Sequence, residues 1–289
     1  MTMERRLSGD APSLTLPRGA VDAQTHMYLP GFDARPGGPA LPPGELPTPA
    51  QYRRVMDWLG IGRVIVTNGN AHQADNGNLL ACLAEMGEVA RGVAVVSSRT
   101  SEAEMARLAD GGIVGARIMD LPGGAVGLSE LEAVDERAAA HGWMVAVQFD
   151  GSAILEHEAR LAALRSRWVL DHHGKFFSGA SPNGPEIAAV KRLIDGGGCW
   201  FKFAGVYESS RDGAPHYEDV AANARAVAAH APERIVWGTN WPHNLAKTTA
   251  EYPDDRALLD TVLGWLPGEE ARRKALVDNP EELFGLPAL

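Results

Sequence analysis

The chain has 289 residues, of which 45% are hydrophobic and 22% are charged, and its formal net charge at pH 7 is -10. This length is sufficient for one large domain or two ordinary ones. A strongly negative chain is a poor partner for a phosphate backbone, and no stretch reaches the ~20 apolar residues of a membrane span. We therefore expect neither a nucleic acid nor a membrane as a partner, and an anionic ligand would require a local cluster of cationic side chains.

Two features indicate the compartment. The N-terminal sequence "MTMERRLSGDAPSL" has two arginines but no apolar segment behind them, so it does not resemble a signal peptide. Cys82 and Cys199 lie in apolar surroundings, where two reduced core residues are favoured over a single disulfide. The sequence thus predicts a cytoplasmic protein, and it does not define the oligomeric state.

A short apolar run, rich in β-branched residues and followed by a helical pattern, recurs about every 31 residues. This alternation predicts an α/β fold, a single (β/α)8 barrel of the TIM type over residues 1–289. A doubly wound sheet is the alternative, but "VDAQTHMYLPG" at the first run is not a glycine-rich phosphate turn. The expected strands are Ala20–Ala23, Val64–Thr67, Val93–Val96, Val114–Met119, Met144–Phe149, Trp168–Leu170, Trp200–Phe203 and Ile235–Trp237.

Helix-start signals lie between these runs. Thr48 and Pro49 are expected to be the N-cap and the first residue of one helix, and Pro185 is expected to open another that ends at the glycines 196–198. Capping boxes beginning at Ser101 and Ser129 predict two further starts.

The segment 30–49 departs from the repeat, because it contains seven of the nineteen prolines and four glycines. Such a composition excludes a helix or a central strand. The segment follows the first strand, so in a barrel it would lie over the catalytic mouth, and we interpret it as a semi-rigid lid rather than an interdomain linker.

Polar side chains gather where the expected strands end, which is where chemistry collects in barrels of this type. Lys202 stands between Phe201 and Phe203 and therefore points to the opposite side, the barrel interior. The strand-end residues are Gln24, His26, Asn68, Asn70, His72, Gln73, Arg117, Asp120, Gln148, Asp150, Asp171, His172, His173, Lys175, Lys202, Tyr207, Arg211, Asn240, Trp241 and His243.

Motifs along almost the whole chain resemble the amidohydrolase superfamily, in the branch that contains 2-pyrone-4,6-dicarboxylate hydrolase and the metal-dependent decarboxylases. The matching motifs are "VDAQTH", "VGARI", "VLDHHG", "CWFKFAG", "IVWGTNWPH" and "NPEELFGL". The resemblance implies a (β/α)8 barrel with a His-x-His on strand one, histidines on strands five or six and an Asp on strand eight. Longer stretches such as "NGNAHQADNGN" and "KFAGVYESSR" are similar to the lactone isomerases of that branch.

Two positions differ from the family pattern. The usual His-x-His is Gln24-Thr25-His26, and the usual strand-eight Asp is Asn240. A catalytic zinc needs about three His or carboxylate ligands and one open position, whereas amides are weak ligands. We therefore predict no tightly bound metal and no cofactor, with Asp150 or Asp171 as the residues that would restore a ligand in the alternative case.

The resemblance implies a reaction that does not need an activated water. Conversion of an aldaric acid 1,5-lactone to its 1,4-lactone is such a reaction, because a hydroxyl of the substrate attacks the acyl carbon. An oriented internal nucleophile has an effective molarity of ~10⁵ M or more. The expected partner is therefore a small aldaric acid lactone, and a role in hexuronate oxidation follows from the resemblance alone.

Roles at the site are hypotheses. His172 or His173 is the expected general base and acid, Asp171 sets its tautomer, and Asn240 positions a hydroxyl or stabilises an oxyanion. Cationic side chains are expected to hold the carboxylate and lactone oxygens. The expected substrate-binding residues are Gln24, His26, Asn70, His72, Arg117, Gln148, Asp150, Lys202, Tyr207 and Arg211.

Alternatives remain at this stage. A metal-independent lactone hydrolase would use Asp150 or Asp171 as a base, and a degenerate barrel would bind a sugar acid without turnover. Arg117 would have a purely structural role if it paired with Asp120 or Asp150. His72, His173 and His243 are each equally well explained as ordinary hydrogen-bonded loop histidines.

Overall fold

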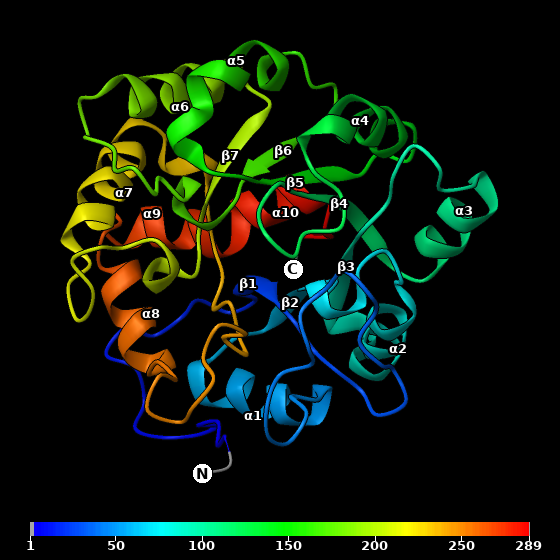
Figure 1. The fold of residues 1–289 in the computed structure, drawn as a ribbon. Coiled ribbons are helices and arrows are strands. Elements are labelled where there is room, and N and C mark those ends of the chain that lie inside the picture. The colour runs from blue at the N-terminus through cyan, green and yellow to red at the C-terminus, as the bar shows by residue number, and fades with distance from the viewer. Residues whose placement is uncertain (1–2, 289) are drawn as a thin grey trace.

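The structure is a computed structural model that describes residues 3–288, and it shows one sheet of eight parallel strands in the order β1 to β8 (Figure 1). Every strand pairs with the next one along the chain, which confirms the expected barrel in place of a doubly wound sheet. The strands are β1 Val21–Thr25, β2 Arg63–Thr67, β3 Ala90–Ala94, β4 Ile113–Met119, β5 Met144–Gln148, β6 Trp168–Leu170, β7 Cys199–Phe203 and β8 Ile235–Trp237.

The ring closes beyond the end of β8. The backbone N–H of Asn240 donates to the carbonyl of Gln24 at 2.9 Å, and the N–H of His26 donates to the carbonyl of Trp241 at 2.8 Å. These bonds join the loop after β8 to the end of β1, so the residues of "GTNWPH" lie directly beside Gln24 and His26.

Helices surround the strands, as Figure 1 shows. The first seven each connect one strand to the next and bury an apolar face against the outside of the barrel, and the last three follow β8. The α-helices are α1 Pro49–Leu59, α2 Gly77–Met86, α3 Glu102–Asp110, α4 Leu131–Ala140, α5 Ile154–Ala162, α6 Pro185–Asp195, α7 Glu218–His230, α8 Asp255–Leu263, α9 Glu269–Arg273 and α10 Asn279–Phe284.

Apolar residues fill the barrel interior at the end where the strands begin. One buried cluster contains inward-facing strand residues such as Ile65 and Met144 together with Leu283 and Phe284 of α10. The last helix therefore closes the end of the barrel where the strands begin, and polar chemistry is left for the opposite end.

Most sequence expectations for the elements are confirmed. Thr48 caps α1 by accepting from the N–H of Gln51 at 3.4 Å, and the Ser101 hydroxyl accepts from the N–H of Glu104 at 3.2 Å. The Ser129 capping box is wrong, because residues 128–130 form a 3₁₀ turn before α4. Glu132, the acid of that pattern, instead accepts from Arg160 of α5.

The segment 30–48 has no helix or strand along its described length and lies at the mouth of the barrel, as expected. The backbone N–H of Arg35 donates to the carbonyl of Ala71 in the loop after β2. Arg5 holds the segment from the other side by donating to the carbonyls of Pro43 and Glu45. The lid is therefore fastened at two places.

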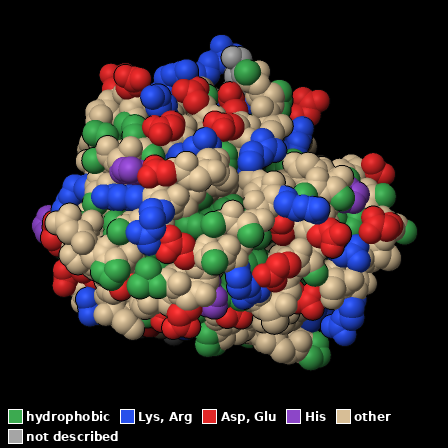
Figure 2. Space-filling model, turned by 90° about the horizontal axis from the view of Figure 1, so that it is seen from above, with side chains coloured by type: hydrophobic (Ala, Val, Ile, Leu, Met, Phe, Trp, Pro, Cys, Tyr) green, Lys and Arg blue, Asp and Glu red, His purple; other side chains and the backbone are tan. Residues whose placement is uncertain are grey.

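The surface carries both signs of charge, and Figure 2 shows acidic and basic side chains interspersed over one face. Within residues 3–288, every helix is too short or too polar to cross a bilayer.

Candidate active site

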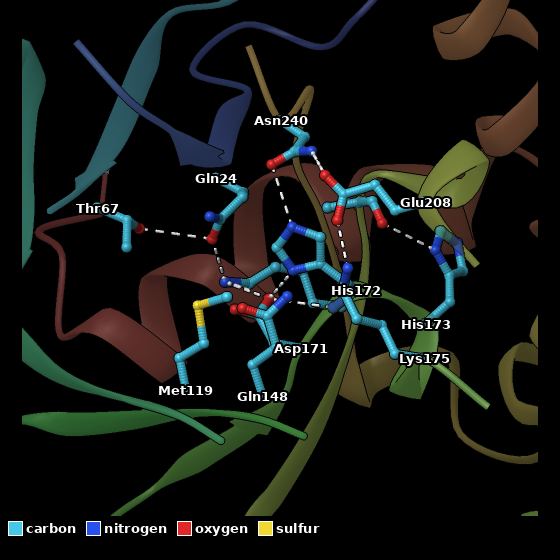
Figure 3. Close-up of polar contacts among 12 residues, drawn as sticks. Gln24, Thr67, Met119, Gln148, Asp171, His172, His173, Lys175, Glu208 and Asn240 are labelled. Atoms are coloured by element: carbon cyan, nitrogen blue, oxygen red, sulfur yellow. Dashed lines mark hydrogen bonds and ion pairs between the residues drawn. The ribbon is translucent and has the colours of Figure 1, made fainter. Parts of the chain in front are cut away.

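Where the strands end, the inward-facing side chains change from apolar to polar and meet at the centre of the barrel (Figure 3). The loops after β6, β7 and β8 add further polar groups to this layer. The central cluster, as we name this set, consists of Gln24, His26, Arg117, Gln148, Asp171, His172, Lys175, Lys202, Glu208 and Asn240.

A β-bulge brings Gln24 into the cluster. Val21 and Ala23 face the barrel interior, and strict alternation would place Gln24 on the outside. The pairing register of β1 with β2 shifts between Asp22 and Thr25, which re-aims the side chain. Gln24 Oε1 consequently accepts from Lys202 Nζ at 2.8 Å.

Lys202 and Asp171 form a fully buried ion pair, with 3.0 Å between Nζ and Oδ1. Burial alone would raise the pKa of Asp171, but Lys202, His172 and Arg117 hold it well below its usual range. Burial lowers the pKa of Lys202, and the charge of Asp171 acts against that shift. The expectation that Lys202 points into the barrel is confirmed.

His172 faces Asn240, with 3.1 Å between Nε2 and Oδ1. Its other ring nitrogen, Nδ1, lies 3.1 Å from Asp171 Oδ1 without hydrogen-bond geometry, so that contact is electrostatic. His172 and Asn240 are both buried, with exposed fractions of 2% and 3%. The imidazole is therefore held between an amide oxygen and a carboxylate.

Glu208 and Lys175 form a second ion pair beside Asn240. Glu208 Oε1 accepts from Asn240 Nδ2 at 2.7 Å, and Oε2 accepts from Lys175. Burial would raise the pKa of Glu208, but Lys175 and His172 lower it to about 2. The carboxylate is thus ionised at neutral pH.

His26 is held as a neutral ring. Its Nδ1 lies 2.9 Å from the carbonyl oxygen of Thr67, which can only accept, so Nδ1 carries the hydrogen. Nε2 accepts from the amide of Gln24 at 3.3 Å. Burial, reinforced by the charge of Arg117, lowers the pKa of His26 to about 3.

Arg117 is a buried guanidinium whose partners are neutral. It donates to Asn70 Oδ1 at 2.9 Å and to Gln148 Oε1 at 2.8 Å, and its Nε has no partner among the described residues. No ion pair forms with Asp120 or Asp150, whose carboxylates accept from backbone N–H groups in their own loops. The structural alternative for Arg117 is therefore not supported by the geometry.

A cavity of about 410 Å³ opens above Arg117, between the lid and the loops after β2, β4 and β8. Asn70 and Met119 line this cavity, and both contact the guanidinium. Its size is within the range of small-molecule sites. Asn70 and Met119 therefore link the cavity to the guanidinium of Arg117, which does not itself line it.

Five residues of the loops after β6 and β8 adopt a left-handed backbone that non-glycine residues rarely use. The φ angles are 48° for His172, 55° for His173, 46° for Lys175, 62° for Asn240 and 58° for His243. Such conformations persist where the surroundings impose them and are concentrated at functional sites. The side chains around Asn240 are therefore placed at some cost in backbone energy.

The family model "Amidohydrolase" matches residues 21–286. The chain belongs to the amidohydrolase family.

Relatives within the family are similar over nearly their full length. The chain is 66% identical over 282 residues to a D-galactarolactone isomerase of Agrobacterium fabrum (strain C58 / ATCC 33970), which covers 98% of this chain and 96% of that protein. It is 32% identical over 289 residues to a 2-pyrone-4,6-dicarboxylate hydrolase of Comamonas testosteroni, covering 94% and 92%. An apo crystal structure of a protein from Agrobacterium tumefaciens superposes with a TM-score of 0.96 at 65% identity, covering 99% and 100%.

The metal site that the family resemblance implies does not fit the residues present. Gln24 and Asn240 replace two ligands, and His26 Nδ1 is used by the carbonyl of Thr67. The ammonium of Lys202 occupies the position between Gln24 and Asp171. Across residues 3–288, no three His, Cys, Asp or Glu side chains converge as a metal-binding group.

Several expected site residues lie outside the central cluster. His173 turns its ring outward, stacks on Phe203 at 5.0 Å and contacts the carbonyl of Ala204 through Nδ1. Asp150 caps a 3₁₀ turn by accepting from Ser152. The structure thus corrects their expected position at the centre, because the left-handed turn at His172 and His173 directs the two rings to opposite sides.

Arg211 and His72 are also displaced from the expected centre. The Arg211 side chain is 63% exposed and lies near Asp219 on the outer face. His72 packs against Tyr28 with 5.5 Å between ring centroids, beside the cavity wall. Tyr207, by contrast, contacts the cluster as expected, since its hydroxyl accepts from Asn240 Nδ2 at 2.9 Å.

Glu208 is the main functional candidate that the sequence did not reveal. It directly follows the expected site residue Tyr207 in the loop after β7, but it was not singled out there. Its ion-pair partner Lys175 was visible as a strand-end residue, but without an assigned role. The available clue was the charge match between two loops that follow neighbouring strands.

Proposed function

We propose that the protein is a D-galactarolactone isomerase, which converts D-galactaro-1,5-lactone to the 1,4-lactone. The observation that carries this proposal is the 66% identity to such an isomerase over 98% of the chain. The substrate is then an aldaric acid monolactone with one free carboxylate. Both the attacking oxygen and the leaving oxygen belong to this substrate, so the reaction needs no second reactant.

Arg117 binds the free carboxylate in this proposal. It is buried, its partners are neutral amides and a thioether, and two of them, Asn70 and Met119, line the cavity. A thioether is a weak acceptor, so a carboxylate easily displaces Met119 Sδ from the guanidinium. The geometry supports anion binding at this point in a chain whose net charge is -10.

The charge of the central cluster favours the same ligand. Three cations, Arg117, Lys175 and Lys202, stand against two carboxylates, Asp171 and Glu208, which leaves one positive charge before any histidine is protonated. A monoanionic lactone neutralises that charge on binding. Burial strengthens the attraction, because the local dielectric is far below that of water.

The reaction proceeds without a metal in this proposal. A metal in such a site activates water by lowering its pKa, and the internal hydroxyl of the lactone takes the place of that water. The hydroxyl on C4 attacks the lactone carbonyl, a tetrahedral intermediate forms, and the ring oxygen on C5 departs. Lys202 is the cationic group that stabilises the oxyanion.

Proton handling requires one group that accepts and one that donates. Glu208 is an ionised carboxylate at neutral pH, and His172 is the titratable group on the other side of Asn240. Asn240 donates both amide hydrogens within the protein, to Tyr207 and to Glu208, so it presents only an acceptor oxygen. Its amide cannot act as an oxyanion donor in this arrangement.

Proton NMR of enzyme treated with a chelator and incubated with D-galactaro-1,5-lactone tests the proposal. We expect the 1,4-lactone to form ahead of open-chain galactarate, at the same rate with and without the chelator. Open-chain acid as the first product would identify a hydrolase, like the relative at 32% identity. No change beyond a buffer control would contradict enzymatic function on this substrate.

A further inference from the structure

A continuous chain of hydrogen bonds leads from Asn240 to a buried carboxylate outside the central cluster. Asn240 Nδ2 lies 2.9 Å from the hydroxyl of Tyr207, that hydroxyl lies 2.6 Å from His243 Nδ1, and His243 Nε2 lies 2.9 Å from Asp255 Oδ1. His243 and Asp255 are 1% and 2% exposed. Water therefore does not compete for these contacts.

The chemistry of the groups fixes the direction of every bond in the chain. The Asp255 carboxylate only accepts, so His243 Nε2 carries a hydrogen. A neutral His243 then accepts at Nδ1, which makes the Tyr207 hydroxyl a donor to it. The Tyr207 oxygen remains free to accept, and Asn240 Nδ2 donates to it.

Glu208 fixes the same amide a second time. Its Oε1 accepts the other hydrogen of Asn240 Nδ2 at 2.7 Å. Since both amide hydrogens are directed to acceptors, Asn240 Oδ1 is the atom that faces His172 Nε2 at 3.1 Å. An amide oxygen only accepts, so His172 Nε2 must carry a hydrogen.

The other face of the ring favours a hydrogen on Nδ1 as well, so the two contacts together favour a ring that is protonated on both nitrogens. Asp171 Oδ1 lies 3.1 Å from His172 Nδ1, and Lys202 keeps Asp171 ionised. A bare nitrogen lone pair at that distance from a carboxylate is repelled, whereas a protonated nitrogen is attracted. The other charged and titratable groups around the ring are Lys175, Lys202, Glu208, His26 and His173.

We propose that Tyr207, His243 and Asp255 are positioning residues that fix the amide of Asn240 and thereby keep Nε2 of His172 protonated, so that His172 enters the reaction as the proton donor. This inference rests on the proposed function for the identity of the receiving oxygen.

The proton balance of the isomerisation follows from this assignment. The bond between the C4 oxygen and the acyl carbon forms while the hydroxyl proton passes to Glu208. The bond between the acyl carbon and the C5 oxygen breaks, its electron pair stays on that oxygen, and the proton from His172 Nε2 joins it. One proton is taken up and one is released, and exchange with solvent restores both side chains.

Nitrogen-15 NMR of histidine-labelled enzyme without substrate tests the proposal directly. A long-range proton–nitrogen spectrum distinguishes protonated from bare ring nitrogens, and His172→Gln assigns the His172 signals by their loss. At pH 7 we expect a protonated Nε2 in the wild-type protein. A bare Nε2 at that pH would overturn the proposal, whatever the enzyme does with the lactone.

Two variants test the chain itself. Tyr207→Phe removes the hydroxyl, and Asp255→Asn allows the chain to reverse, so in both we expect a smaller fraction of protonated Nε2 and a roughly tenfold lower kcat at little change in KM. The alkaline limb of the kcat profile, where the donor loses its proton, should move to lower pH. Unchanged His172 signals and an unchanged pH profile in both folded variants would overturn the positioning role.

Tyr217→Phe is the matched control, because Tyr217 is also a largely buried tyrosine but lies at the start of α7, outside the chain. We expect wild-type His172 signals and a wild-type profile in this variant. If the wild-type enzyme showed the protonated Nε2 but no isomerisation, the proposed function would fail and the protonation state would stand.

Discussion

Asn240 shows how a single amide sets the chemistry open to this barrel. Its Nδ2 lies 2.7 Å from the ionised carboxylate of Glu208, and it donates there. A carboxylate at position 240 would instead face Glu208 as a like charge, and two carboxylates at such a distance cannot both ionise easily. The amide at 240 and the acid at 208 therefore depend on each other.

Asn240→Asp tests this dependence. We expect the free energy of unfolding to fall by about 1–3 kcal/mol, because a buried carboxylate loses its donor and gains a like charge. The isomerase kcat/KM should fall at least tenfold, without a gain of lactone hydrolysis. Urea unfolding and NMR product analysis measure the two effects.

The double variant Asn240→Asp/Glu208→Gln is its control, because it exchanges the positions of acid and amide. We expect most of the lost stability to return. A single variant as stable as the wild type, or a double variant less stable than the single one, would contradict the coupling.

Arg117→Lys tests carboxylate binding. A lysine keeps the charge but loses the planar pair of donors, so we expect KM for the lactone to rise about 10- to 100-fold with a smaller change in kcat. Steady-state kinetics measure the changes in KM and kcat separately. The control is Arg211→Lys, the same change at an exposed site, which should leave both constants as they are. A KM unaffected by Arg117→Lys would remove Arg117 from the binding site.

At the scale of the residue, the sequence predicted those positions that follow a strand directly. Arg117, Asp171 and Lys202 belong to this group, because alternation along a strand fixes which side chains face inward. Gln24 was also expected at the site, but it faces inward only because of the β-bulge in β1. It failed at His173 and Arg211, whose direction is set by left-handed turns and loop packing. Glu208 was missed because its place depends on a loop whose path only the packed structure defines.

At the scale of the element, Asp22 joins the first strand to the loop after the last one. Its carboxylate accepts from the backbone N–H and the hydroxyl of Thr239, and from the hydroxyl of Tyr52 on α1. The side chain is fully buried, and burial raises its pKa to about 6 against the partial opposition of these hydrogen bonds. The hydrogen bonds that close the barrel therefore depend on the protonation state of Asp22.

The sign of this coupling gives a pH prediction. The folded protein keeps the Asp22 proton up to about pH 6, whereas the unfolded chain releases it near its ordinary pKa of 3.8, so this group's contribution to stability is lost as pH rises through that window. A difference of about two pKa units corresponds to about 3 kcal/mol. In Asp22→Asn, which does not titrate, we expect that part of the pH dependence to disappear.

Urea unfolding at pH 4 and at pH 6.5 measures this difference. Between pH 4 and pH 6.5, the free energy of unfolding should fall less in the variant than in the wild type. The hydroxyls of Tyr52 and Thr239 can reorient to form hydrogen bonds with the new amide. Equal pH dependence in both proteins would show that Asp22 does not hold a proton in the folded state.

The helices and strands were predictable in so far as their signals are local. Thr48, Ser101 and Pro185 mark helix starts through capping chemistry within a few residues. Ser129 carried the same local pattern, but Glu132, the acid of that pattern, pairs with Arg160 on α5. Strand β3 begins at Ala90, earlier than its most apolar residues suggest, because pairing with β2 begins there.

At the scale of the whole molecule, the barrel was predictable because the spacing of apolar runs leaves few alternatives. The distribution of charge was less predictable from the sequence. The sequence gives a net charge of -10, yet three cations lie buried at the centre against two carboxylates. Acidic residues on the surface and cations in the core together explain how an acidic protein can receive an anionic lactone.

The central claim is that the acyl group moves between two oxygens of the substrate without water taking part. Turnover of D-galactaro-1,5-lactone in ¹⁸O-enriched water, with mass analysis of the 1,4-lactone at early times, measures this directly. We expect no more label in the product than in a buffer control without enzyme. A clear excess of solvent oxygen in the 1,4-lactone would show that water opens the ring first, and would contradict this claim.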